Sequence, residues 1–248
     1  MSSLFLKIIA MITMLIDHVG DVFFGNYDFL RTIGRIAFPL YALMSVEACI
    51  YMVKKKDGAR KYLLFLFVIA LLSEFGYDKA FYGIFPYSGS QNQVLQFLTF
   101  ALAYGITESI HKKWFSIIVW ILTIGINAHF MIGYNGAGIV FMLMLLYYCR
   151  NMQKKGSAVR ACFLFASLTV LFAGIYFEFY YPVYGLRSLL LIWGNMIRDG
   201  INLGVYLALP FMVEYDFTYG NIPKPLRFFY RIFYPLHLTI LAILRMIL

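Results

Sequence analysis

Residues 4–24, LFLKIIAMITMLIDHVGDVFF, decide the class of fold. A helix needs about 20 mainly apolar residues to cross the hydrocarbon core of a bilayer, and this stretch meets that requirement. It carries Asp17 and His18 where a removable signal peptide would have small residues around its cleavage site. We therefore expect the stretch to remain in the mature chain as the first membrane-spanning helix.

The composition of the whole chain also indicates a membrane protein. Apolar residues make up 62% of the 248 residues and charged residues 13%, against roughly 45–50% and about 25% in soluble domains. So little polar surface cannot coat a soluble globule, and so hydrophobic a chain is not intrinsically disordered. The net charge of +9 does not indicate a nucleic-acid partner, because the basic residues lie in short loops between apolar runs.

The same length test, applied along the chain, predicts an all-α integral membrane protein with a bundle of about nine spanning helices, eight to ten in all. No internal repeat or linker divides the chain, so we expect one domain over residues 1–248. The expected spans lie near residues 4–24, 32–53, 62–82, 94–110, 114–131, 136–150, 159–180, 188–213 and 228–247. Arg198, Asp199 and Gly200 interrupt the run 188–213, which is either one long helix or a short re-entrant piece followed by a span.

The distribution of Lys and Arg predicts the orientation. Basic residues cluster at 54–61, 112–113, 150–160 and 224–231, whereas the loops at 83–93 and 131–135 contain none, and the loop at 180–187 contains only Arg187. Loops rich in Lys and Arg stay on the cytoplasmic side. We therefore expect a cytoplasmic N-terminus and an outer C-terminus, which places His18 in the outer half of the membrane.

Ionisable side chains within the spans are candidate site residues, because each costs several kcal/mol to place in lipid. The candidates are Asp17, His18, Arg35, Glu47, Glu74 and His237. Glu47 and Glu74 have the alternative of pairing with a cation inside the bundle. Asp21 lies one helical turn after His18 and is expected to orient its imidazole, with Arg35 at the same level. Such a cluster is either an acid–base centre with an oxyanion partner or polar glue between helices.

Three segments carry a family resemblance: LKIIAMITMLIDH at 6–18, IGRIAFPLYA at 33–42 and FYRIFYPLHL at 229–238. In this order and spacing they closely resemble the TraX family, membrane proteins associated with N-terminal acetylation of conjugative pilin. Residues 83–200 resemble the family mainly in hydropathy, and YNGAG at 134–138 loosely follows its glycine-rich turn. Tyr219, Gly220 and Asn221 depart from the Tyr-Asn-Gly expected before the last helix.

The resemblance implies a transmembrane acetyltransferase that uses acetyl-CoA as the acyl donor. It implies that His18 is the catalytic base, that Asp17 is its electrostatic companion, and that Arg35 binds the donor or the oxyanion. The residues assigned to binding of the substrate or acyl donor are His237, Tyr234, Glu47, Glu74 and Lys7. The expected location is the bacterial cytoplasmic membrane, with the bilayer as a partner and no metal. The acceptor stays open between a pilin-like peptide, a glycan and a small amine.

The predicted layout suits this chemistry. Imidazole titrates near neutral pH and can take a proton from an attacking amine or hydroxyl. Acetyl-CoA is made in the cytoplasm, so its phosphates would meet the basic loops and the acetyl group would pass along a tunnel towards His18. Two other classes compete: a proton- or ion-coupled transporter using the same ionisable residues, and a non-enzymatic membrane assembly factor.

Overall fold

The computed structural model describes residues 1–25, 28–55, 57–184, 200–218 and 223–248. Within these ranges the chain forms helices and loops, and its only β interaction is an isolated bridge between Gln91 and Ile132. The predicted all-α fold is therefore confirmed.

The helices α1 to α12 follow the chain, with a π-helical and a 3₁₀ segment labelled η1 and η3. They are α1 (Ser3–Phe23), α2 (Asp28–Gly34), α3 (Ala37–Val53), α4 (Gly58–Phe81), α5 (Gln93–Ile110), α6 (Lys113–His129), α7 (Asn135–Tyr147), η1 (Tyr148–Met152), α8 (Ser157–Tyr184), α10 (Gly200–Leu203), η3 (Gly204–Ala208), α11 (Leu209–Val213) and α12 (Lys224–Ile247).

Several of these helices can cross a membrane. By length and hydropathy alone, four stretches of the described chain qualify: Ser3–Phe23, Phe29–Val53, Ser157–Phe177 and Pro225–Ile247. The chain is thus a helical membrane protein, and the number of about nine spans stays a prediction. In the run 188–213 the structure describes only α10, η3 and α11. Arg187, Arg198 and Asp199 lie outside the described residues, as do Tyr219, Gly220 and Asn221.

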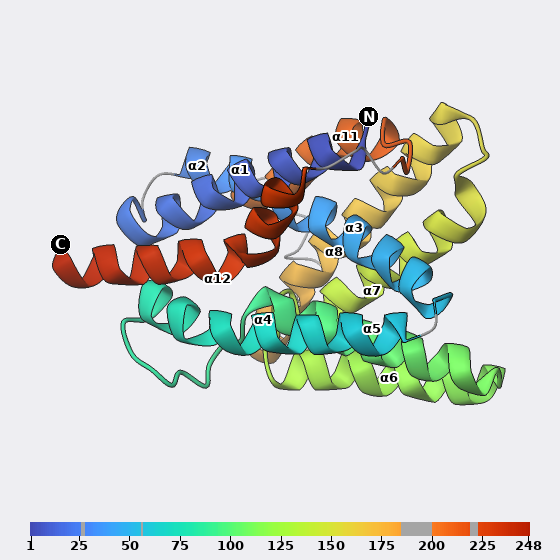
Figure 1. The fold of residues 1–248 in the computed structure, drawn as a ribbon, viewed down its shortest axis with the longest axis horizontal. Helices are drawn as coiled ribbons and strands as arrows, with labels where there is room; N and C mark the ends of the chain where they lie inside the picture. The colour runs from blue at the N-terminus through green and yellow to red at the C-terminus, as the bar shows by residue number, and fades with distance from the viewer. Residues whose placement is uncertain (26–27, 56, 185–199, 219–222) are drawn as a thin grey trace.

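Three of the four basic clusters lie in connections at the same end of the molecule, and the predicted orientation stays a prediction. Figure 1 shows the connections after α3, after α5 and after η1 at one end of the molecule, on the right. These connections carry the basic clusters at 54–61, 112–113 and 150–160. The loop between α4 and α5 lies at the opposite end, as does the C-terminus (Figure 1). Helices α1 and α12 pack together and run in the same direction.

The predicted span 32–53 is not one continuous helix. Helix α2 ends at Gly34 and α3 begins at Ala37, so Arg35 lies in a turn between them. Pro39 gives the physical reason. Its ring has no N–H to donate and would clash with the carbonyl of Arg35 if the helix continued through this point. The break was not expected, and it places Arg35 at the junction of α2 and α3.

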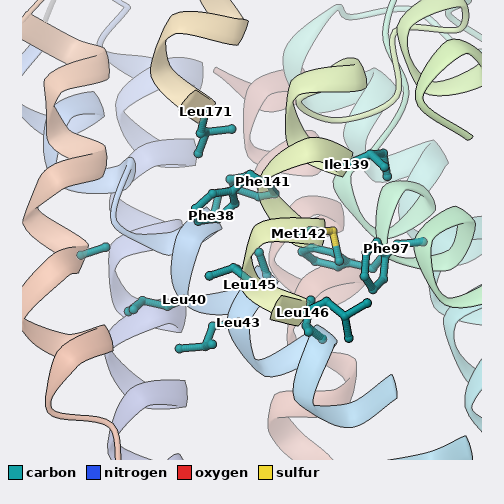
Figure 2. Packing of buried hydrophobic residues seen from close by; sticks show 14 of the residues in the cluster. Phe38, Leu40, Leu43, Phe97, Ile139, Phe141, Met142, Leu145, Leu146 and Leu171 are labelled. Atoms are coloured by element: carbon teal, nitrogen blue, oxygen red, sulfur yellow. The ribbon is translucent and has the colours of Figure 1, made fainter. Parts of the chain in front are cut away.

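The main core lies where α3 and α7 cross in the middle of the bundle. Figure 2 shows Phe38, Leu40 and Leu43 of α3 close to Phe141 and Leu145 of α7. All five side chains are buried. Large apolar side chains are instead exposed along α4, α6 and α12, where the bilayer would cover them.

Helix α12 packs along α4 at very short range. A Cβ atom added at Gly76 would lie 2.9 Å from the backbone nitrogen of Thr239, so only glycine allows the two helices to approach this closely. Pro235 lies inside α12, and the helix changes direction partway along its length (Figure 1). Because proline has no N–H, the carbonyl of Arg231 loses its usual helical donor.

Candidate active site

Two histidines from opposite ends of the chain meet between α1 and α12. Nδ1 of His18 lies 2.7 Å from Nε2 of His237, and the two rings are nearly parallel. The phenyl ring of Phe81 stands edge-on to His18, and Phe233 stacks on His237. Tyr234 stands edge-on to both imidazoles. This aromatic surround fixes both rings, and His237 is only 4% exposed.

The hydrogen bonds assign the protons on the neutral pair. Nδ1 of His237 lies 2.8 Å from the carbonyl oxygen of Phe233. A carbonyl can only accept, so Nδ1 of His237 carries the proton and its Nε2 is an acceptor. His18 must then donate from Nδ1, which leaves Nε2 of His18 unprotonated. A neutral His18 is thereby held as the tautomer with its proton on Nδ1 and its lone pair on Nε2.

Beside the histidines lies a cluster of two acids and one cation. Arg31 forms ion pairs with both Asp17 and Asp21. The expectation that Asp21 orients the imidazole was wrong: Arg31 holds Asp21, and His237 orients the imidazole. Gly34 packs against the Asp17 side chain so closely that any Cβ there would overlap it. The charges of Arg31 and Arg35 both act on Asp17 and on His18.

Arg35 contacts a tyrosine from a distant part of the chain. Its Nη1 donates a hydrogen bond to the hydroxyl oxygen of Tyr134, at 2.9 Å. The Tyr134 ring stacks on Phe38, with 4.1 Å between the ring centroids. The backbone N–H of Tyr134 donates to Oε1 of Gln96. The segment 134–138, which leads into α7, is therefore tied to the turn between α2 and α3, to α3 and to α5.

A partly open cavity of about 260 Å³ extends from His18, Asp17 and Tyr134 towards the other end of α1. At one end it is lined by Asp17, His18, Tyr134 and Tyr234, and at the other by Lys7, Tyr230 and Arg231. Its middle is largely apolar and includes Met14, Phe38, Met44, Phe65, Leu66 and Phe97. Lys7 and His18 are eleven positions apart on one helix, which is about 16 Å at 1.5 Å per residue. The cavity is thus an elongated hollow with a basic end and a histidine end.

The remaining predicted site residues divide between the cavity and the packing around it. Lys7 lines the cavity, and its Nζ lies 4.7 Å from the centre of the Tyr230 ring. Glu47 and Glu74 are not among its lining residues. The carboxylate of Glu47 accepts a hydrogen bond from the hydroxyl of Tyr215, at 2.6 Å, and Glu74 accepts one from Asn92. Both glutamates thus hold other parts of the chain together through hydrogen bonds. Their role in binding stays a prediction.

Sequence reasoning missed Arg31, Tyr134 and Gln96. Arg31 had a readable signal, because Asp17 and Asp21 are one helical turn apart and so are Arg31 and Arg35. Gln96 had one as well, since a buried amide in an apolar helix must find partners. Its Nε2 donates to the carbonyls of Ile132 and Asn135. Among the described residues, no group of three His, Cys, Asp or Glu side chains is arranged to hold a metal.

The fold and the site together define a helical membrane protein with a cavity that reaches His18, whose ring contacts His237. The family profile described as TraX protein matches residues 2–245, nearly the whole chain. The chain belongs to the TraX family, and the resemblance read from its three sequence segments is confirmed. Comparison with curated proteins gives no match, and comparison with solved structures gives none either.

Proposed function

We propose that the protein is a transmembrane acetyltransferase that moves the acetyl group of cytosolic acetyl-CoA to an amine or hydroxyl at or across the membrane. The observation that carries the proposal is the hydrogen bond between His18 and His237 at one end of the cavity. It holds His18 with an unprotonated Nε2, which is the form that a general base requires. Membership of the TraX family supports acetyl as the group transferred and an amine as the acceptor.

In the proposed step, His18 alone moves the proton of the acceptor to the departing CoA. The acceptor nitrogen, or a hydroxyl oxygen, attacks the thioester carbonyl carbon as Nε2 of His18 takes its proton. The carbonyl π electrons move to oxygen and then return as the carbon–sulfur bond breaks. The thiolate of CoA leaves and takes up the proton from His18. The products are the acetylated acceptor and free CoA, and the imidazole returns to its starting form.

The basic end of the cavity suits the phosphates of the donor. Lys7 and Arg231 both line it, and Arg231 is exposed at that end. Both cations also lie against aromatic rings, Lys7 over Tyr230 and Arg231 over Phe65. A largely apolar hollow that extends about 16 Å along α1 between Lys7 and His18 suits a thin acyl-carrying arm. We place this basic end towards the cytoplasm of a bacterium, following the charge of the loops.

The proposal is tested with purified protein in liposomes that enclose radiolabelled acetyl-CoA. The external acceptor is a membrane extract from cells that lack the protein, or in parallel a peptide with a free N-terminus, an amino sugar and a simple alkylamine. Transfer of label that disappears in His18→Ala supports the proposal. Wild-type transfer that is unchanged in His18→Ala removes His18 as the base.

A transporter would give a different result in the same liposomes. It would carry protons or ions down a gradient without any release of CoA thiol. Flux without acetyl transfer would overturn the enzymatic proposal, and lack of both would favour an assembly factor. CoA thiol release that depends on an added acceptor would distinguish transfer from simple hydrolysis of the donor.

A further inference from the structure

Arg35 and Tyr134 are joined by a hydrogen bond, and of these two residues only Tyr134 lines the cavity. Tyr134 lines the cavity together with His18, whereas Arg35 is not among its described lining residues. Arg35 donates to the Tyr134 hydroxyl from the side, at 2.9 Å. A hydrogen bond to a molecule in the cavity can therefore come from the Tyr134 hydroxyl and not from the Arg35 guanidinium.

The direction of this hydrogen bond determines what the tyrosine can do. A guanidinium has five N–H donors and no acceptor, so the Tyr134 oxygen accepts and its own hydrogen stays free to be donated. Donation from a cation polarises the hydroxyl and strengthens the next hydrogen bond in the chain. The Tyr134 hydroxyl is thus a reinforced donor for a neighbouring oxygen.

The tyrosine is also held in place before any molecule binds. Its ring stacks on Phe38, which is 5% exposed, and its backbone N–H is bound by Gln96. Gln96 in turn holds the carbonyls of Ile132 and Asn135 on either side of Tyr134. A donor fixed in this way costs no reorganisation when charge develops beside it.

We propose that the Tyr134 hydroxyl is the hydrogen-bond donor to the carbonyl oxygen of the acyl group, and that Arg35 is a positioning residue that acts through it. The inference rests on the proposed function and names a further catalytic residue for it. As the acceptor attacks the thioester carbon, the π electrons move to the carbonyl oxygen, and the Tyr134 hydroxyl stabilises that oxyanion without losing its proton. The bond is released when the carbonyl reforms and the CoA thiolate departs.

The test compares steady-state acetyl transfer by Tyr134→Phe and by the wild type. Loss of one oxyanion donor lowers kcat by roughly 10²–10³-fold in enzymes where this has been measured. We expect a fall of that order in Tyr134→Phe, with KM for acetyl-CoA changed by less than about two-fold, because the bond strengthens only in the transition state. The matched control is Tyr104→Phe, since Tyr104 also accepts from an arginine, Arg150 at 2.8 Å, but lies outside this cavity.

The role of Arg35 is tested in the same series with Arg35→Lys and the double variant. If Arg35 acts through Tyr134, Arg35→Lys lowers kcat in the wild type but has little further effect in Tyr134→Phe. Multiplicative losses, or a Tyr134→Phe variant with wild-type kcat beside an inactive His18→Ala, would overturn this inference and leave the proposed function standing. Lack of acetyl transfer by the wild type would overturn both. Gel filtration and thermal unfolding of each variant identify any that fails to fold.

Discussion

His18 and His237 are 219 positions apart in the chain, yet a ring nitrogen of each lies 2.7 Å from the other. The contact joins the first helix of the chain to the last, so the site exists only when α1 and α12 are packed together. The same contact determines the tautomer of His18, because His237 already donates to the carbonyl of Phe233. The packing of α1 against α12 and the tautomer of His18 are therefore coupled.

The first prediction concerns the two histidines. His18→Ala should lower kcat for acetyl transfer by roughly 10²–10⁴-fold, the usual contribution of a general base. His237→Leu should lower it by about 10²-fold, since the imidazole of His18 loses the acceptor that fixes its tautomer. His237→Gln keeps a side-chain acceptor and should retain more activity than His237→Leu. Initial rates with saturating acetyl-CoA measure these differences.

His129→Ala is the control for the histidine series. His129 is exposed at the end of α6, and its removal should leave the rate unchanged. If His237→Leu were as active as the wild type, the hydrogen bond would be a packing contact and would not orient the base.

The second prediction concerns the basic end of the cavity. Lys7→Gln and Arg231→Gln should each raise KM for acetyl-CoA about ten-fold, the equivalent of one charge-assisted hydrogen bond of roughly 1.5 kcal/mol. The values of kcat should change little, because the phosphates are remote from the reacting carbon. Acetyl-pantetheine, a donor without the nucleotide, should bind wild type and variants equally.

Lys55→Gln separates specific from general electrostatics in that experiment. Lys55 lies in a basic loop against the ring of Tyr51 and does not line the cavity. An equal rise of KM in Lys55→Gln would mean that the overall positive field of this end, and not the two lining cations, attracts the donor.

The third prediction concerns the contact between α4 and α12. Gly76→Ala should destabilise the protein by about 1–3 kcal/mol, because its new methyl group meets the backbone of Thr239 and backbone cannot move aside easily. Gly125→Ala in α6 is the control, since a Cβ there meets nothing within 4 Å. It should be neutral or stabilising by up to about 1 kcal/mol through helix propensity. Thermal unfolding in detergent compares the two, and equal stabilities would contradict the close contact.

The helical fold could be predicted from the sequence because lipid leaves few choices. A long apolar run must satisfy its backbone hydrogen bonds internally, so hydropathy alone indicates a helix. Predicting the break before α3 also requires the effect of Pro39 on the carbonyl four residues earlier. The number of spans depends in part on residues 185–199, which lie outside the described chain.

The candidate site could be predicted only in part. His18, Asp17 and Tyr234 were placed by motif, and the structure brings all three to one cavity. The contact between His18 and His237 was not predicted, because periodicity along one helix carries no information about a partner on another. Tyr134 was missed for the same reason, since its position depends on Phe38 and Gln96 and not on its own neighbours in sequence.

The final prediction tests the ion cluster that sequence reasoning assigned wrongly. Arg31 pairs with both Asp17 and Asp21, whose side chains are 16% and 33% exposed. Arg31→Met should therefore cost about 3 kcal/mol, the low end for breaking a buried pair, because Asp21 is partly solvated. Arg31→Met combined with Asp21→Asn should recover part of that loss, as removing one stranded carboxylate relieves the cluster.

Arg150→Met is the matched control for this cluster. Arg150 pairs with Glu108 at 2.8 Å, but the two side chains are 42% and 32% exposed, so the loss should stay below about 1 kcal/mol. Chemical unfolding in detergent measures the stabilities of the wild type, the two single variants and the double variant. If Arg31→Met and Arg150→Met cost the same, the pairs of Arg31 are ordinary surface contacts. Asp17 would then need another source of stabilisation beside His18, since a carboxylate stranded in lipid costs several kcal/mol.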